Sequence, residues 1–430
     1  MSQPVRILLA LALGLLLGIA VSRGAPHLVE TTVAAVEPVG GLWLDALRMT
    51  IVPLIVSLLV TGIAASAEAA RASRLAGRAV LLFVAILWAS AIIAALLTPA
   101  LLGLWPMPAE AATALRGALG AQEPVGEVPT VAQFVRSLVP SNPVAAAAND
   151  QILPLMVFTM VFAFALTRLP DAPRAQLTGF FQAIADAMLV IVNWVLWLGP
   201  IGVFALAYVV GARAGGAAFG ALAHYVVVVT LVGCVIWFLA WPLAMAGGRT
   251  GLGAFTRAVG PAHAVAISTQ SSLASLPAML KGAERLGVPV AASGVTLPLA
   301  VAVFRATGPA MNLAVAIYVA HWLGYPLNGW TIAAGVAMAA TTTIGSVSLP
   351  GSISFITSIA PICYAMGVPI EPLALLVAVE TLPDIVRTTG NVAMDVATTS
   401  TVARRTGFDE AEPLTEQDRL LSEGEAKGAG

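Results

Sequence analysis

Apolar residues run along this chain in segments of membrane-spanning length, separated by polar connections. A helix needs about 20 predominantly apolar residues to cross a bilayer, because each residue advances it by only about 1.5 Å. Eight segments reach or approach that length, at residues 7–22, 41–66, 79–104, 150–167, 178–212, 219–247, 288–322 and 372–403. The pattern predicts an all-α polytopic membrane protein with eight transmembrane helices.

Two polar breaks interrupt the apolar pattern in the second half of the chain, at residues 268–277 and 341–352. Both are rich in hydroxyl side chains, and both contain Ser-Leu-Pro. Irregular backbone at membrane depth is tolerated only where protein or a water-filled cavity surrounds it. We therefore predict two re-entrant helical hairpins rather than ordinary loops, near 250–287 and 331–368, one entered from each side. Such a pair is typical of an inverted-repeat transporter that aims helix ends at an anionic ligand.

The last apolar segment carries an ionic stripe, formed by Glu380, Asp384, Arg387, Asn391 and Asp395. Their spacings of 4, 3, 4 and 4 place them on an arc of about 80° of a helix. Each charge costs on the order of 3 kcal/mol to insert, so such groups mark a solute pathway or binding site. Asp384 and Arg387 could form only an intrahelical ion pair, but that interpretation leaves Glu380 and Asp395 unexplained.

Composition supports a membrane protein and excludes several other classes. Hydrophobic residues make up 59% of the 430 and charged residues only 10%, against about 25% in soluble domains. The net charge of −1 argues against nucleic acid as a partner. Cys234 and Cys363 lie in apolar runs, which favours buried thiols over a disulfide or a metal site. Neither a phosphate-binding Gly-rich loop nor a nucleophile–base motif is present, so we expect no cofactor and no enzymatic activity.

Basic residues predict the orientation of the chain, since cytoplasmic connections carry an excess of arginine and lysine. If the segments cross alternately, one side receives Arg6, Arg71, Arg74, Arg78, Arg168, Arg174, Arg249, Arg257, Arg404 and Arg405. We therefore expect an inner-membrane protein with both termini in the cytoplasm. The polar, acidic stretch 406–430 is expected to be a disordered cytoplasmic tail.

The ionic stripe also carries a family resemblance. Residues 384–395 resemble the Asp-x-x-Arg-Thr-x-x-Asn-x-x-x-Asp signature of the dicarboxylate/amino acid:cation symporters, the glutamate transporter family. Ser271-Ser272, Pro350-Gly351 and the run 199–205 resemble further parts of it. The resemblance implies a homotrimer within lipid, with residues 1–405 as the transporter. Helices 1, 2, 4 and 5 would form a scaffold, past which helices 3, 6, 7 and 8 and both hairpins slide as an elevator.

The resemblance also implies roles for individual residues. Asp384 would hold a substrate amino group, Arg387 a side-chain carboxylate and Asn391 the main-chain carboxylate. A guanidinium suits the second role independently, because its planar fork matches a carboxylate. The remaining implied contacts are a hydroxyl from Thr388, backbone near Ser271, Ser272 and Leu349 around the carboxylate, and a cation, possibly sodium, at Asp395 and Asn391.

The seventh helix departs from the family pattern. Where the family usually carries Asn-Met-Asp-Gly-Thr, which helps to bind sodium, this chain has the run 304–308, Phe-Arg-Ala-Thr-Gly. The third helix has Trp88-Ala89-Ser90 in place of a clear hydroxyl pair. Arg305 thus puts a permanent positive charge near the position where the family binds a mobile sodium ion. A buried arginine needs partners of opposite charge. Asp395 is the first candidate partner and Glu380 the second.

Three interpretations of Arg305 follow. In the first, it replaces a sodium ion, so that coupling is proton-driven or reduced, with Glu380, Asp384 or Asp395 as the proton carrier. In the second, it binds a second substrate carboxylate, and in the third, it snorkels to a vestibule in a structural role. The predicted function is secondary active symport of an acidic amino acid or dicarboxylate with H⁺ or Na⁺. A carrier for cystine or a neutral amino acid, and an anion-conducting channel, are the alternatives.

Overall fold

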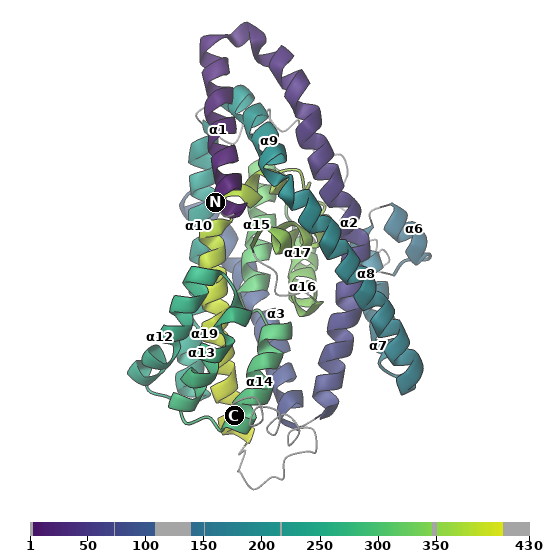
Figure 1. The fold of residues 1–430 in the computed structure, drawn as a ribbon, viewed down its shortest axis with the longest axis vertical. Helices are drawn as coiled ribbons and strands as arrows, with labels where there is room; N and C mark the ends of the chain where they lie inside the picture. Colours follow the sequence, from purple (N-terminus) through teal and green to yellow (C-terminus); the bar gives the residue numbers. More distant parts are fainter. Residues whose placement is uncertain are drawn as a thin grey trace, which may run out of the picture.

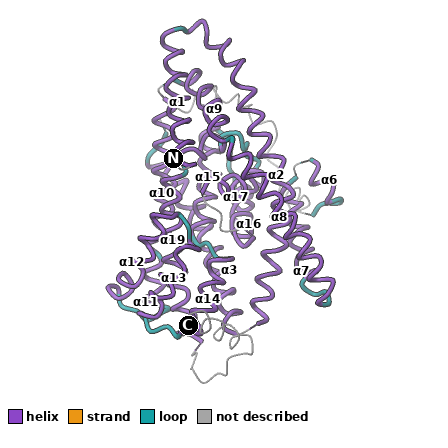
Figure 2. Tube along the Cα trace, in the orientation of Figure 1, coloured by secondary structure: helices purple, strands orange, loops and turns teal. Residues whose placement is uncertain are grey.

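The computed structural model describes residues 3–72, 74–107, 139–149, 151–215, 217–345 and 351–406. Every regular element in these ranges is a helix, which confirms the all-α prediction for them (Figure 2). Six of the described helical stretches are long and apolar enough to cross a membrane. The predicted disordered tail lies outside the described residues apart from Thr406, and so does Leu349 at the tip of the second predicted hairpin.

The helices follow one another with few long connections among the described residues (Figure 1). The first half contains α1 (Gln3–Gly24), η1 (Pro26–Leu28), α2 (Val29–Ala72), α3 (Arg74–Leu104), α6 (Pro143–Ala148), α7 (Ile152–Leu166), α8 (Asp171–Trp197) and α9 (Gly199–Ala214). The second half contains α10 (Ala217–Phe238), α11 (Ala240–Ala246), α12 (Leu252–Thr269), α13 (Ser272–Arg285), α14 (Val290–Val303), α15 (Thr307–Leu323), α16 (Gly329–Gly345), α17 (Gly351–Met366), α18 (Leu373–Leu376), η2 (Val377–Val379) and α19 (Thr381–Thr406).

Two predicted spans are interrupted in the structure. The segment predicted at 178–212 is divided between α8 and α9, where Pro200 sits in the first turn of α9. Proline has no backbone N–H, so it is tolerated at a helix start but not in its interior. The segment predicted at 288–322 is divided between α14 and α15, and residues 304–306 between them are not helical. The second interruption is the important one, because it exposes backbone beside the ionic stripe.

Small residues let α1 and α9 pack with their backbones in close contact. Gly14 and Gly18 form a Gly-x-x-x-Gly pattern, the arrangement that permits tight packing of membrane helices. A Cβ atom added at Gly18 would lie 2.3 Å from the Tyr208 carbonyl oxygen and 2.6 Å from the Ala212 nitrogen. A Cβ atom added at Gly211 would lie 2.5 Å from the Leu15 carbonyl oxygen. Neither position can hold a larger residue unless the helices move apart.

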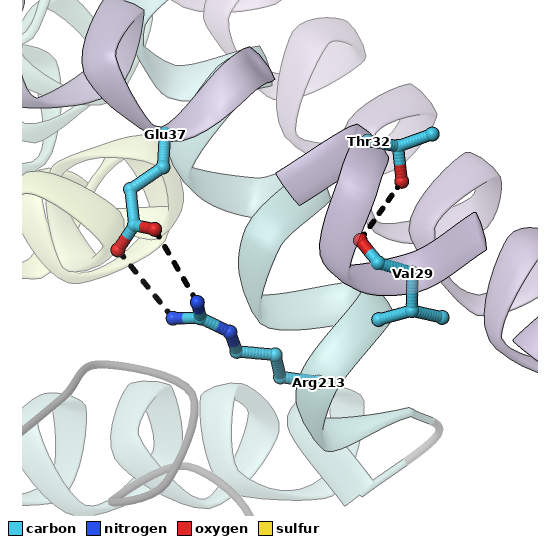
Figure 3. Close-up of polar contacts among 4 residues, drawn as sticks. All are labelled: Val29, Thr32, Glu37 and Arg213. Carbon is cyan, nitrogen blue, oxygen red and sulfur yellow. Dashed lines mark hydrogen bonds and ion pairs between the residues drawn. The ribbon is translucent and has the colours of Figure 1, made fainter. Parts of the chain in front are cut away.

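Polar contacts join α2 to the same group of helices. Arg213 on α9 forms an ion pair with Glu37 on α2, with 3.3 Å between Nη2 and Oε2 (Figure 3). One turn earlier on α2, the hydroxyl of Thr32 donates to the Val29 carbonyl oxygen at 3.1 Å (Figure 3). The indole of Trp43 donates to the Val195 carbonyl oxygen on α8 at 2.8 Å. Helices α1, α2, α8 and α9 are therefore one packed group.

Two pairs of short helices lie where the hairpins are predicted. Helices α12 and α13 have 18 and 14 residues, and α16 and α17 have 17 and 16. All four fall short of the about 20 residues that a span requires. The partners of each pair pack against each other. The first pair is joined at Gln270, whose left-handed φ of 51° turns the chain, and Ser271.

Helix α19 lies at the centre of the second half of the molecule. It packs against α10, α11, α12, α13, α14, α15 and α3. Figure 1 shows α19, in yellow, between α10 and the α12–α13 pair. A helix surrounded in this way can carry polar residues, because they face protein rather than lipid. The fold thus places the ionic stripe inside the protein.

Replacement of Gly18 by alanine should destabilise the protein by about 1–3 kcal/mol, the usual cost of overpacking a close-packed interior. The added methyl group would meet backbone atoms, which cannot rotate away. Gly41→Ala on α2 is the matched control, since nothing lies within 4 Å of its added Cβ. Thermal unfolding in detergent should show a lower midpoint for Gly18→Ala only. Equal midpoints in the two variants would contradict the close α1–α9 packing.

Candidate functional site

The ionic stripe of α19 is buried along its whole length. The exposed fraction is 0% for Asp395 and 9% for Arg387, the two extremes of the stripe. Glu380 precedes the helix, and its carbonyl oxygen accepts the Asp384 N–H at 2.8 Å, which continues the helical register into α19. The predicted stripe thus exists as one polar face inside the protein. Thr388, predicted to supply a hydroxyl, is buried beside it.

Arg387 is held by Glu380 rather than by Asp384. Its Nη2 atom lies 2.6 Å from Oε1 of Glu380, two helical turns away. The second oxygen of Glu380 accepts a hydrogen bond from the hydroxyl of Tyr225 on α10, at 3.3 Å. A charge-assisted contact of this kind is short and directional. The close ion-pair partner of Arg387 is thus Glu380, while its charge also interacts with that of Asp384.

The non-helical segment 304–306 is tied to the stripe through Thr307. The backbone N–H of Thr307 donates to Oδ1 of Asn391 at 2.9 Å. Its hydroxyl lies 2.8 Å from that same oxygen and 2.8 Å from the Arg387 carbonyl oxygen. The side-chain oxygen of Asn391 thus caps the start of α15, where the first N–H groups lack helical partners. This arrangement leaves the amide N–H groups of Asn391 as its means of binding an anion.

Helix α3 holds the same segment from the other side. The hydroxyl of Ser90 donates to the Ala306 carbonyl oxygen at 2.5 Å. The rings of Phe83 and Phe304 stack with centroids 4.4 Å apart. Ser90 therefore ties α3 to the N-cap residue of α15, at the point where the helix is interrupted. No local pattern predicts this contact, because Ser90 is the one hydroxyl residue in the run Trp88-Ala89-Ser90.

Arg305 lies in this segment, within electrostatic range of two carboxylates and of Arg387 in the stripe. It is partly buried, and its charge interacts with those of Asp384 and Asp395. Asp395 is the first partner that the sequence predicts. The second predicted partner, Glu380, is instead in contact with Arg387. The departure from the family pattern thus places a guanidinium among the acidic residues of the site.

All three carboxylates of the stripe keep unused hydrogen-bonding capacity. Among the described residues, neither oxygen of Asp395 has a hydrogen-bond partner, and both oxygens are buried. The Oδ2 atom of Asp384 is also buried without a hydrogen bond, and so is Oε1 of Glu380, although the latter lies 2.6 Å from Nη2 of Arg387. A buried carboxylate in this state is costly unless it is protonated or binds a cation. Each of the three is therefore a candidate for a proton or a ligand.

The first helical pair brings its serines to the start of α13. The hydroxyl of Ser271 accepts the Ala274 N–H at 3.2 Å and so caps that helix. Ser272 is the first residue of α13, and both serines are half-buried. Helices α12 and α13 pack against α19. A capped helix start with its positive dipole end is suited to a carboxylate. Leu349, the corresponding predicted residue of the second pair, lies outside the described residues.

The charge of the site follows from its members. Glu380, Asp384 and Asp395 contribute three negative charges when ionised, and Arg305 and Arg387 contribute two positive charges. The ionised site therefore has a net charge of −1, which one proton or one monovalent cation would neutralise. Within the described ranges, no group of three or more His, Cys, Asp or Glu side chains is placed to hold a metal ion.

Three residues of the site carry no motif in the sequence. Thr307, Ser90 and Tyr225 support Asn391, the segment 304–306 and Glu380 respectively. Each lies on a different helix from the residue it supports. Of the three, Thr307 alone has a sequence position that hints at a role in the site, because it falls in the stretch where the chain departs from the family pattern.

Known proteins with similar sequences support the family resemblance. A profile of the sodium:dicarboxylate symporter family matches residues 4–405. The chain is 27% identical over 423 residues to the proton/glutamate-aspartate symporter of Escherichia coli (strain K12), covering 97% of this chain and 96% of that protein. It is 26% identical to the C4-dicarboxylate transport protein of Solibacter usitatus (strain Ellin6076), covering 93% and 91%. It is 28% identical to the neutral amino acid transporter B(0) of Bos taurus, covering 91% and 77%. The chain is therefore a transporter rather than an enzyme, and it belongs to the sodium:dicarboxylate symporter family.

Proposed function

We propose that this protein is a secondary active symporter that carries an acidic amino acid across the inner membrane with a coupling cation. The observation that carries the proposal is the presence of Arg387 and Asp384 on one buried face of α19. A guanidinium recognises a carboxylate, and a buried carboxylate with an unused oxygen suits an ammonium group. The named relatives include a glutamate-aspartate symporter and a C4-dicarboxylate transporter.

Asp384 favours an amino acid over a plain dicarboxylate as substrate. A dicarboxylate would bring two negative charges and no ammonium group, so it would leave Asp384 uncompensated. An acidic amino acid brings the ammonium group together with both carboxylates. Ser271 and Ser272 at the start of α13, Thr388 and the backbone near Leu349 complete the proposed contacts. Transport of cystine or a neutral amino acid, and anion conduction, are the alternative outcomes of the test below.

Glu380 makes substrate binding a competition for Arg387. The 2.6 Å ion pair with Glu380 neutralises the Arg387 guanidinium in the absence of substrate, but its Nε and Nη2 atoms make no hydrogen bond among the described residues. A substrate carboxylate must displace Glu380 or share the guanidinium with it. Either event changes the charge balance at Glu380, which makes this residue one of the three proposed proton carriers.

Arg305 is proposed to replace one of the cations that the family binds. Its guanidinium interacts with Asp395 and Asp384, the carboxylates that need positive charge. The substrate would then need one fewer external cation, and a proton on Glu380, Asp384 or Asp395 would supply the coupling. The alternative roles of Arg305 are binding of a second substrate carboxylate and a structural role near a vestibule. The uptake experiment below tests them as well.

We further propose an elevator mechanism in a homotrimer, with both termini in the cytoplasm. In this account the scaffold contains α1, α2, α7, α8 and α9. The moving part contains α3, α10, α11, α14, α15, α18 and α19 with both hairpins. Arg48 on α2 pairs with Glu371, which lies between α17 and α18. That ion pair would connect the static scaffold to the moving part. A cross-link at the same two positions can therefore test which helices belong to each part.

Uptake of labelled aspartate into proteoliposomes should be saturable, driven by a proton gradient, and insensitive to sodium. Arg387→Lys should weaken the apparent affinity by at least about tenfold, since lysine keeps the charge but loses the planar fork. Arg305→Met should make uptake depend on sodium, because Asp395 then needs an external cation. The measurement is initial uptake with sodium, proton and no gradients.

Each alternative gives a different result in that assay. Strict sodium dependence of the wild-type protein would contradict the role of Arg305 as a tethered cation. Uptake that does not saturate with aspartate concentration would identify a channel. Saturable uptake of cystine or a neutral amino acid, with no competition by aspartate, would reject the proposed substrate class.

A cross-link between positions 48 and 371 should abolish uptake, because it ties α2 to the moving part. The variant carries Arg48→Cys and Glu371→Cys, with Cys234 and Cys363 replaced by alanine, and is treated with a bifunctional methanethiosulfonate. Dithiothreitol should restore uptake. The matched control joins positions 37 and 213, an ion pair within the proposed scaffold (Figure 3), and should keep uptake. Normal uptake with the 48–371 cross-link intact would contradict this division.

A further inference from the structure

Basic side chains gather where α12 begins and α13 ends. A Cβ atom added at Gly282 on α13 would lie 2.6 Å from the Ala258 carbonyl oxygen on α12, so the two helices touch there. Lys281 and Arg257 are the preceding neighbours of these two residues. Both side chains are exposed. The contact between the helices therefore brings two exposed cations onto adjoining turns.

The end of α19 adds further cations to the same region. The guanidinium of Arg404 donates to the Leu286 carbonyl oxygen, at the end of α13, over 3.4 Å. The connection between α11 and α12 also meets α19, because a Cβ atom added at Gly248 would lie 2.4 Å from Oγ of Ser400. We call these residues the basic patch, which consists of Arg249, Arg257, Lys281, Arg285, Arg404 and Arg405.

The described residues around the basic patch do not balance its charge. Residues 240–289 and 396–406 contain six arginine or lysine residues and one acidic residue, Glu284, which gives a net charge of +5. All six basic residues are exposed, and none forms an ion pair with a carboxylate of the described residues. The excess of arginine on cytoplasmic connections accounts for a basic surface, but not for an anionic segment that matches it.

The chain that follows α19 carries the opposite charge. Residues 407–430 contain seven acidic and two basic residues, a net charge of −5. The segment starts beside the patch, because Thr406 directly follows Arg405. Five of the seven acidic residues lie within 12 residues of Thr406. Twelve residues extend over at most about 40 Å, so these carboxylates are within reach of the patch.

Covalent attachment makes this contact more favourable than contact with a separate peptide. A single exposed ion pair contributes only about 0–1 kcal/mol. A short flexible linker, however, provides an effective concentration in the millimolar range, and several pairs form together. Because the charges are exposed, the contact must weaken as salt screens them.

We propose that the acidic segment 409–425 docks on the basic patch and slows transport. The docked segment would bridge α12, α13 and α19 at the end of the helical pair opposite Ser271 and Ser272. It would therefore resist movement of this pair relative to α19. The effect on transport rests on the proposed function, whereas docking itself does not.

Electron paramagnetic resonance distances in the full-length protein test the docking. Nitroxides are attached at Leu252→Cys, on the exposed first residue of α12, and at Ser422→Cys, with Cys234 and Cys363 replaced by alanine. The protein is held in phosphatidylcholine nanodiscs, which offer no anionic lipid. The distance distribution should be narrow at about 0.01 M salt, where the Debye length is about 30 Å, and broad at about 1 M, where it is about 3 Å.

Charge variants show which groups hold the segment. Arg257→Glu should broaden the distribution at low salt, and so should replacement of the seven acidic residues of 407–430 by their amides. Arg168→Glu is the matched control, because it is also exposed but follows α7, on the opposite side of the molecule from α12 (Figure 1). It should leave the distribution narrow.

Two results would overturn the docking. One is a broad distribution at low salt in the protein with its acidic segment intact. If Arg257→Glu also weakened binding of phosphatidylglycerol vesicles in that case, the patch would be assigned to lipid headgroups instead. The other is a narrow distribution that neither salt nor the charge variants change.

Uptake of labelled aspartate at fixed gradients tests the effect on transport, with choline chloride as the added salt on both sides. If more than half of the molecules have a docked segment, the amide variant should be at least about twofold faster at low salt. Added salt should bring the wild type up to the same rate, and Arg168→Glu should respond to salt as the wild type does. Equal rates at low salt, in a variant whose segment no longer docks, would overturn the slowing of transport. Absence of aspartate uptake in every variant would contradict the proposed function and leave the docking intact.

Discussion

Burial of charge beside lipid is the constraint on which the rest of this structure depends. Three carboxylates and two guanidiniums lie on or beside α19, where water cannot solvate them freely. Such groups persist only when each is paired, protonated or bound to a ligand. The polar groups of the helices packed around α19 therefore replace water as the partners of these charges. Glu380 forms an ion pair with Arg387, Thr307 donates to the side-chain oxygen of Asn391, and the charge of Arg305 interacts with those of Asp384 and Asp395.

The interruption between α14 and α15 follows from the same constraint. An unbroken helix would bury its own backbone groups and present only side chains to the stripe. The break instead offers the Thr307 N–H to Asn391 and brings Arg305 beside Asp384 and Asp395. Ser90 on α3 donates to the Ala306 carbonyl group at the same break. The site is thus assembled from α3, α10, α15 and α19, and none of these could form it alone.

The sequence predicted the helical class, the short helical pairs and the polar face of α19, because each depends on a local pattern. Apolar runs predict helices, and a spacing of three or four residues places side chains on one face. The partners of those side chains were harder to predict. Glu380 pairs with Arg387 rather than with Arg305, and Thr307, Ser90 and Tyr225 reach the site from other helices. Such contacts depend on how helices pack, which no local spacing encodes.

The central claim is that Arg305 takes the place of a bound cation at Asp395. The most direct test is a cryo-electron microscopy map of the full-length protein with aspartate and sodium, at a resolution that separates ions from water. The account predicts the Arg305 guanidinium in contact with the Asp395 carboxylate, with no ion coordinated by that carboxylate. A sodium ion bound to Asp395, with Arg305 turned away from it, would contradict the account.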